Sequence, residues 1–219
     1  KETLEDKVAN KKKLGFPVPI REWIKEEDIY NHIYKPIIDI SKRIGNGNLY
    51  FLSPTFTTKF LLVNETILSK LNINNEKEVM TWDDFEELAE KIKRTMNNDD
   101  IIPISLGPSG KEGFFMDFEL LTKTLEIPMK SDTGKIYGDE RWNDIFYKFL
   151  NMYKKYGIQN ETFEGELADD GKIALRIIYP NELTKLNNVN YDFNVYPIPV
   201  FENKDDTASI IPQNIAISN

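Results

Sequence analysis

The residue types that most often carry enzyme chemistry are nearly absent from this chain. It has no cysteine and a single histidine, His32, among 219 residues. Disulfides, thiolate nucleophiles, iron–sulfur clusters and Cys/His zinc sites are therefore excluded, and a Ser-His-Asp triad would have to use His32. His32 lies between Ile29 and Ile33 in an apolar run, a place more typical of a packed or half-exposed histidine than of a base. Much of the enzyme chemistry that depends on cysteine or histidine is therefore excluded before any motif is considered.

The segment 107–112 (Gly-Pro-Ser-Gly-Lys-Glu) superficially resembles a phosphate-binding loop. A true loop has a further glycine at the position of Ser105, and Ser or Thr at the position of Glu112. Without that glycine the amides cannot wrap a phosphate, and without that hydroxyl a magnesium ligand is missing. We predict a strand-to-helix turn here.

Adjacent carboxylates could supply the acid and base of a glycosidase. Four pairs of adjacent aspartates occur, at 83–84, 99–100, 169–170 and 205–206. Neighbours on one loop rarely point at the same atom, and Asp83-Asp84 suits the first turn of a helix, where the dipole favours anions. A hydrolase that pairs Asp117 or Glu119 with Asp170 is an alternative supported only by the acid content.

Four aromatic residues lie outside the helical spacing of the others, at predicted strand-to-loop junctions: Phe56, Phe114, Phe115 and Tyr179. Proteins of the α/β class usually bind ligands at such junctions. Aromatic faces there could bind sugars or other flat, partly apolar molecules, although chance placement accounts for these positions equally well.

Composition and charge restrict the class of partner. Apolar residues make up 40% of the chain and charged residues 29%, which is typical of a globular protein. Lys and Arg number 28 against 36 Asp and Glu, a formal charge of −8, so neither nucleic acid nor an anionic membrane is an expected partner. No apolar run approaches the roughly 18 residues of a spanning helix.

Periodicity and breakers predict alternating helices and strands. Isoleucines at helical spacing from 29 to 44 predict a helical stretch that Pro36 splits in two. Thr81 and Asp84 predict a capping box that begins a helix over 82–95. Further helices are expected at 115–125 and 139–156, and strands at 49–52, 60–63, 101–106, 173–179, 193–200 and 210–218. This alternation predicts the α/β class.

Six short segments, in this order, resemble one family. They are LYFLSP at 49–54, LLVNE at 61–65, TWDDF at 81–85, DGKIAL at 170–175, YPIP at 196–199 and NIAIS at 214–218. In these segments the chain is similar to extracellular solute-binding proteins of ABC importers, in the sugar-binding group that includes maltose-binding protein. TWDDF is the most specific of the six.

The resemblance implies a periplasmic-binding-protein-like two-lobe fold of type II, with solute held between the lobes. Residues 1–55 would be the end part of the first lobe, 56–200 the second lobe, and 201–219 the return crossing. Family members are longer at both ends, so we expect a partial chain. The implied function is non-enzymatic: binding of a solute, expected to be a saccharide, and delivery to an ABC permease. It needs no catalytic residue, and we expect no metal and no cofactor. A sensory module of the same fold that feeds a membrane receptor is the alternative.

The resemblance also implies a location and site residues. We expect a monomeric, lipid-anchored protein outside a Gram-positive bacterium, or a periplasmic one if the source is Gram-negative. Thr55, Phe56 and Thr57 occupy the first crossing, and Phe114 and Phe115 a region of aromatic contacts. Tyr179 and Asn181 stand where many sugar binders place a stacking tryptophan. Gln213 and Asn214, after the second crossing, could supply amide contacts.

Overall fold

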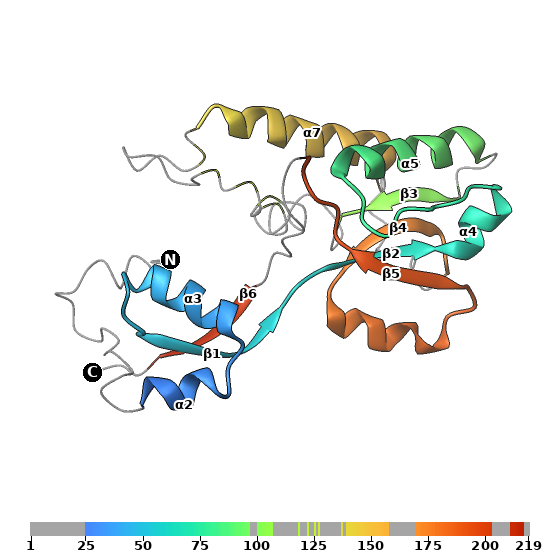
Figure 1. Cartoon of the computed structure of the whole chain (residues 1–219). Coiled ribbons are helices and arrows are strands. Elements are labelled where there is room, and N and C mark those ends of the chain that lie inside the picture. Colours follow the sequence, from blue (N-terminus) through green and yellow to red (C-terminus); the bar gives the residue numbers. More distant parts are fainter. Residues whose placement is uncertain are drawn as a thin grey trace. The chain divides into compact units, whose positions relative to one another are not determined.

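The chain folds into two compact units, each described here by itself. The computed structural model describes residues 25–96, 100–106, 118, 122, 125, 127, 137, 139–157, 170–202 and 211–216, without the side chains of 26, 44 and 211–216. Unit 1 is Lys1–Thr57 with Ile210–Asn219, and unit 2 is Thr58–Ser209 (Figure 1). The chain therefore enters unit 2 after Thr57 and returns to unit 1 at Ile210.

Unit 1 packs two helices against a two-stranded ribbon. Helices α2 (Glu26–Tyr30) and α3 (Lys35–Ile44) precede β1 (Phe51–Thr57), which pairs antiparallel with β6 (Ile211–Ala216). Pro36 lies in the first turn of α3, where a missing N–H costs nothing, so the predicted split of the helical stretch is confirmed. Ile29, Ile38 and Leu49 form the small core of this unit.

Strand β1 begins later and continues further than the predicted 49–52, because β6 satisfies its backbone as far as Thr57. The register shifts between Leu52 and Thr55, so that Ser53 and Pro54 lie opposite the single residue Asn214. A β-bulge of this kind accommodates proline within a strand. The pairing is long-range in sequence, which explains why local pattern reading ended the strand too early.

Unit 2 is built on a mixed four-stranded sheet. The strands are β2 (Phe60–Asn64), β3 (Ile102–Ser105), β4 (Ile173–Ile178) and β5 (Phe193–Pro197), in the order β3-β4-β2-β5. Only the β3–β4 pair is parallel; β2 runs antiparallel to both of its neighbours. Each predicted strand region therefore contains a strand, with ends that differ by a few residues.

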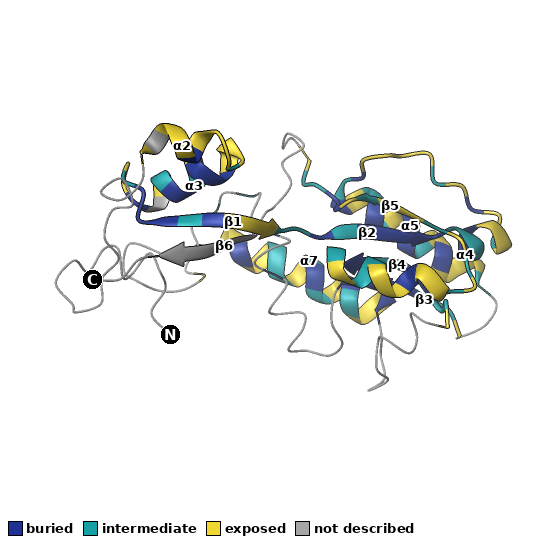
Figure 2. Cartoon of the chain, turned by 90° about the horizontal axis from the view of Figure 1, so that it is seen from below, coloured by how far each residue is buried: buried dark blue, intermediate teal, exposed yellow. Residues whose placement is uncertain are grey.

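The two faces of this sheet have separate cores. Helices α5 (Trp82–Thr95) and α7 (Arg141–Tyr156) cover one face (Figure 1), where Leu61 and Val63 belong to the main core. Leu62 packs instead with Ile178 and Leu186 of the 3-10 helix η3 (Pro180–Asn188). Figure 2 shows the central strands β2 and β4 as mostly buried. The period-2 alternation of β2 thus assigns each side chain to one face.

The predicted helices of unit 2 are confirmed where the structure describes them. In α5, Asp84 N donates to Thr81 Oγ1 (3.1 Å) and Thr81 N donates to Asp84 Oδ2 (2.9 Å), which is the expected capping box. The short α4 (Glu65–Lys70) begins at the N-cap Asn64. Helix η3 was not predicted, and the helix expected at 115–125 lies largely outside the described residues.

Helices α5 and α7 are joined through the carboxylate of Glu90. Lys155 Nζ lies 2.7 Å from Glu90 Oε2, and the Tyr156 hydroxyl and Arg94 also bind this carboxylate. These donors, Lys155 first, lower the pKa of Glu90 from 4.5 to about 2. Glu90 therefore contributes stability at neutral pH that disappears as the carboxylate protonates.

We expect the free energy of unfolding to depend less on pH below about 5 in Glu90→Gln than in wild type. Because the folded-state pKa is depressed, wild type loses this contribution as pH falls from about 5 to about 2, whereas the variant has none to lose. Urea unfolding followed by circular dichroism across this range measures the difference. Glu87→Gln, at an exposed position on the same helix, is the control. Parallel pH curves for wild type and Glu90→Gln would contradict the prediction.

Candidate functional site

The sequence-predicted residues of unit 1 lie together at one end of the β1–β6 ribbon, where β1 ends and β6 begins. Thr55 is the register partner of Gln213, Phe56 of Pro212 and Thr57 of Ile211. Asn214 follows directly, opposite the bulge. Five predicted positions, three from β1 and two from β6, are therefore brought together although the two strands are far apart in sequence. On the β6 side of this site, the structure describes the backbone and not the side chains.

Within β1, the alternation of side chains separates Phe56 from the two threonines. Thr55 and Thr57 share one face of the ribbon and Phe56 the other. The ring of Phe56 stacks on Tyr34, with centroids 6.2 Å apart and planes at 27°. Both rings are exposed, Phe56 at 46% and Tyr34 at 62%. The threonines offer hydroxyls on their face, and the aromatic pair offers apolar ring surface on the other.

Sequence reasoning missed Tyr34. It is the N-cap of α3, and its position before the Lys35-Pro36 helix start is a signal that could have placed it at a helix end. A tyrosine there has no helical neighbours that would bury it, so exposure was predictable. The contact of Tyr34 with Phe56 could not be predicted from the sequence, because it depends on how α3 packs on β1.

The predicted residues of unit 2 lie where β4 passes into η3. Tyr179 directly follows β4 and is the N-cap of η3, with Pro180 in the first turn. Tyr179 N donates to Glu182 Oε2 (2.8 Å), and Glu182 N donates to Tyr179 O (3.0 Å). Arg176 Nη2 donates to the other carboxylate oxygen of Glu182 at 2.6 Å. Both the N–H and the carbonyl oxygen of Tyr179 are therefore hydrogen-bonded to Glu182. Asn181, two residues after Tyr179, is exposed.

A buried lysine lies against the ring of Tyr179. Lys59 Nζ is 4.3 Å from the ring centroid, and the whole residue is only 2% exposed. Lys59 immediately precedes β2, whose first residue Phe60 pairs with Ile178. Sequence reasoning missed this residue too, although a lysine adjoining the apolar run 60–63 was a visible signal.

The structure does not describe all of the remaining predicted residues. Phe114 and Phe115 lie outside the described residues, as do Asp117 and Glu119 of the hydrolase alternative. His32 is exposed, and its Nδ1 lies 2.8 Å from the carbonyl oxygen of Asp28. Among the described residues, no group of three or more His, Cys, Asp or Glu side chains could hold a metal ion.

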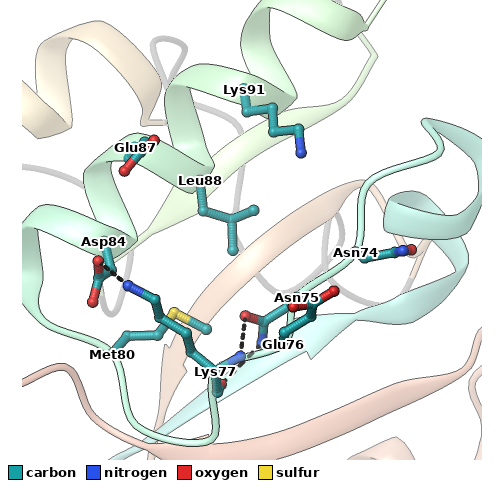
Figure 3. Close-up of a pocket in the computed structure, with 9 residues that line it drawn as sticks. All are labelled: Asn74, Asn75, Glu76, Lys77, Met80, Asp84, Glu87, Leu88 and Lys91. Atoms are coloured by element: carbon teal, nitrogen blue, oxygen red, sulfur yellow. Dashed lines mark hydrogen bonds and ion pairs between the residues drawn. The ribbon is translucent and has the colours of Figure 1, made fainter.

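A small surface pocket lies elsewhere in unit 2, between α5 and the loop before it (Figure 3). Its volume is about 240 Å³. Lys77 and Asp84 in its wall pair with each other at 2.5 Å, and Lys77, first among the causes, lowers the pKa of Asp84. The lining residues are Asn74, Asn75, Glu76, Lys77, Met80, Asp84, Glu87, Leu88 and Lys91. None of them is a sequence-predicted site residue.

Comparison with known proteins identifies the fold. No protein-family model matches the chain, and no curated protein matches its sequence. Solved structures do match. The ABC substrate-binding protein Lmo0181 from Listeria monocytogenes, in complex with cycloalternan, has a TM-score of 0.70 at 14% identity, over 99% of this chain and 55% of its own.

Two further solved structures match in the same way. A family 1 extracellular solute-binding protein from Bifidobacterium longum subsp. infantis has a TM-score of 0.67 at 19% identity, over 99% of this chain and 57% of its own. Maltose-bound MalE3 of T. maritima has a TM-score of 0.62 at 14% identity, over 92% of this chain and 53% of its own.

These matches define a class of fold. The chain has the α/β architecture, with a mixed sheet, of about half of a periplasmic-binding-protein-like solute-binding protein, as the sequence predicted. The three matches named here are an ABC substrate-binding protein in complex with cycloalternan, a family 1 extracellular solute-binding protein and a maltose-bound protein. The chain spans 53–57% of the length of these three proteins. Identities of 14–19% establish the fold and leave the solute open. Within the described part of the chain, no helix is long and apolar enough to cross a membrane.

Proposed function

We propose that this chain is part of an extracellular protein that binds a saccharide and delivers it to an ABC permease. The observation that carries the proposal is the fold match, which extends over 92–99% of this chain to proteins bound to cycloalternan or maltose. In this proposal unit 1 belongs to the first lobe, with residues 1–55 its end part, and 56–200 form most of the second lobe. Residues 201–219 make the return crossing.

The candidate residues offer the two chemistries that saccharide recognition requires. Sugar hydroxyls need hydrogen-bond partners, which Thr55, Thr57 and Asn181 would supply, together with the amides of Gln213 and Asn214. The apolar C–H faces of sugars need flat apolar surface, which Tyr179 would supply together with Phe56, Phe114 and Phe115. No cofactor or metal has a role in such binding, and we propose a monomeric, non-enzymatic protein.

The location follows from the same proposal. A protein that serves a permease works on the outer side of the membrane, and the matched protein from Bifidobacterium longum subsp. infantis is an extracellular solute-binding protein. We propose surface attachment through a lipid anchor in a Gram-positive source, or a periplasmic location in a Gram-negative one. Detection of the protein on intact cells by surface proteolysis tests this placement.

A thermal-shift panel on the full-length protein tests the binding function. The probes are maltose, mannobiose, D-mannitol and D-tagatose, the ligand types of structural matches, with glycine and a tripeptide as controls. A ligand at 100 times its dissociation constant stabilises the folded state by about 2.7 kcal/mol, which raises the melting temperature by several degrees. A shift with a saccharide and none with the controls is expected. Shifts with the tripeptide alone would contradict the proposal.

A further inference from the structure

Two large aromatic side chains of unit 1 are exposed to water, although the same unit buries another aromatic residue completely. Tyr34 is 62% exposed and Phe56 is 46% exposed, whereas Phe51, on the same strand as Phe56, is fully buried. Along β1 the residues change from buried to exposed before Phe56 is reached (Figure 2). Exposed apolar surface gives up the stabilisation that burial provides, and adjoining exposed apolar groups mark binding surfaces more often than scattered ones do.

The rings of Tyr34 and Phe56 form one continuous surface. Their centroids are 6.2 Å apart and their planes meet at 27°. At this distance and angle the rings are displaced sideways, as in offset stacking, so neither ring covers the whole face of the other. The exposure of both side chains agrees with this arrangement. The result is an apolar surface that is two rings long, and therefore longer than a single pyranose ring.

Both rings are carried by helices and strands that hold them in place. Tyr34 is the N-cap of α3, directly before the Lys35-Pro36 start of that helix, and α3 packs on β1. Phe56 is paired with Pro212 of β6. An aromatic side chain has only two rotatable bonds, so holding its ring against a ligand costs little conformational entropy. A surface that is ordered before the ligand arrives binds it more tightly than one that must be ordered first.

The end of the β1–β6 ribbon offers a solute two different faces, and the aromatic face suits saccharide recognition better. Thr55 and Thr57 lie on the opposite face from Phe56 and supply hydroxyl groups but no ring surface. On the aromatic face, the two rings supply the flat apolar surface that the C–H faces of sugars need. Tyr34 adds its phenolic hydroxyl, which can donate or accept a hydrogen bond. One face therefore combines both chemistries.

We propose that Tyr34 and Phe56 form a stacking surface for two neighbouring rings of an oligosaccharide, which makes Tyr34 a ligand-binding residue. The inference rests on the proposed saccharide-binding function and narrows its substrate class to saccharides with two or more rings. A disaccharide uses both aromatic rings, whereas a monosaccharide uses one and can move to the other when the first is removed. Loss of one aromatic ring therefore weakens the binding of a disaccharide more than the binding of its monosaccharide.

The test measures affinities of the full-length protein by isothermal titration calorimetry. The probes are two matched pairs, maltose with glucose and mannobiose with mannose. Wild type is expected to bind a disaccharide more tightly than its monosaccharide, by about tenfold or more. In Tyr34→Ala we expect the affinity for that disaccharide to fall about tenfold, and the affinity for the monosaccharide to fall less than about threefold. Phe56→Ala should behave in the same way.

Further variants separate the ring of Tyr34 from its other properties. Tyr34→Phe keeps the ring and is expected to bind within about threefold of wild type, whereas Tyr34→Leu keeps apolar bulk without a flat face and should resemble Tyr34→Ala. Tyr147→Ala, at a tyrosine of similar exposure on α7, is the matched control and should bind like wild type. Urea unfolding without ligand should give an unchanged midpoint for Tyr34→Ala, because the side chain is mostly exposed. If Tyr34→Ala does not fold, Tyr34→Leu takes its place.

The results that would overturn the inference differ from the result that would overturn the proposed function. Equal disaccharide affinities of wild type and Tyr34→Ala would refute the stacking role. A lowered unfolding midpoint of Tyr34→Ala would also refute it, since the pair would then be packed within the full-length protein and closed to solute. Wild type that binds monosaccharides as tightly as disaccharides would refute the substrate class. In these three cases, saccharide binding by wild type leaves the proposed function standing, whereas wild type that binds no saccharide would refute both.

Discussion

Replacing Trp82 by alanine is expected to lower the free energy of unfolding of unit 2 by about 3–5 kcal/mol. Trp82 is 1% exposed and packs edge-on against Phe85 and Phe149, with ring centroids 5.5 and 4.7 Å away. Its truncation leaves a cavity where α5, α7 and the main core meet. Urea unfolding followed by circular dichroism measures the loss.

Trp82→Phe should cost much less than Trp82→Ala. Among the described residues, no hydrogen-bond partner is found for the buried indole Nε1 of Trp82, so phenylalanine removes an unsatisfied donor while it keeps most of the aromatic contacts. Tyr147→Ala, at a residue of α7 that is 60% exposed, serves as the control and should change stability by less than about 0.5 kcal/mol. Equal losses for Trp82→Phe and Trp82→Ala would show that the indole itself is required.

Glu182→Ala is expected to have the second largest effect, a loss of about 2–4 kcal/mol. The substitution removes the carboxylate that Arg176 binds at 2.6 Å, where the Arg176 side chain is only 11% exposed. It also removes the acceptor of Tyr179 N. Glu182→Gln keeps an oxygen for one of these donors and should lose about half as much. The measurement is urea unfolding of the full-length protein.

A double variant separates the ion pair from the cap. With Arg176→Met already present, Glu182→Ala no longer breaks the ion pair between Arg176 and Glu182, so its cost should fall to about 1 kcal/mol, the value of a helix cap. Lys185→Ala, at an exposed position in the same helix, is the control. Strictly additive losses would contradict the coupling of Arg176 to Glu182.

Glu182→Ala should also weaken saccharide binding if Tyr179 belongs to the solute site, because the backbone of Tyr179 loses its hydrogen-bond partner.

Features fixed by neighbours in sequence were predictable from the sequence by itself. The capping box of Thr81 and Asp84, the start of α3 at Pro36 and the amphipathic α5 and α7 each depend on residues within a few positions of one another. Local steric and hydrogen-bonding preferences decide such features. The alternation of these elements, with six ordered motifs, was sufficient for the fold class, which the solved structures confirm.

Other features depend on which distant segments meet, and only the tertiary structure decided them. The extension of β1 to Thr57 requires β6, about 155 residues away along the chain. The stacking of Phe56 on Tyr34 requires the packing of α3 on β1. The burial of Lys59 against Tyr179 requires the β2–β4 pairing. Sequence patterns report the preference of each residue for water or core, whereas the tertiary fold can overrule that preference, as it does for the buried Lys59 and the exposed Phe56.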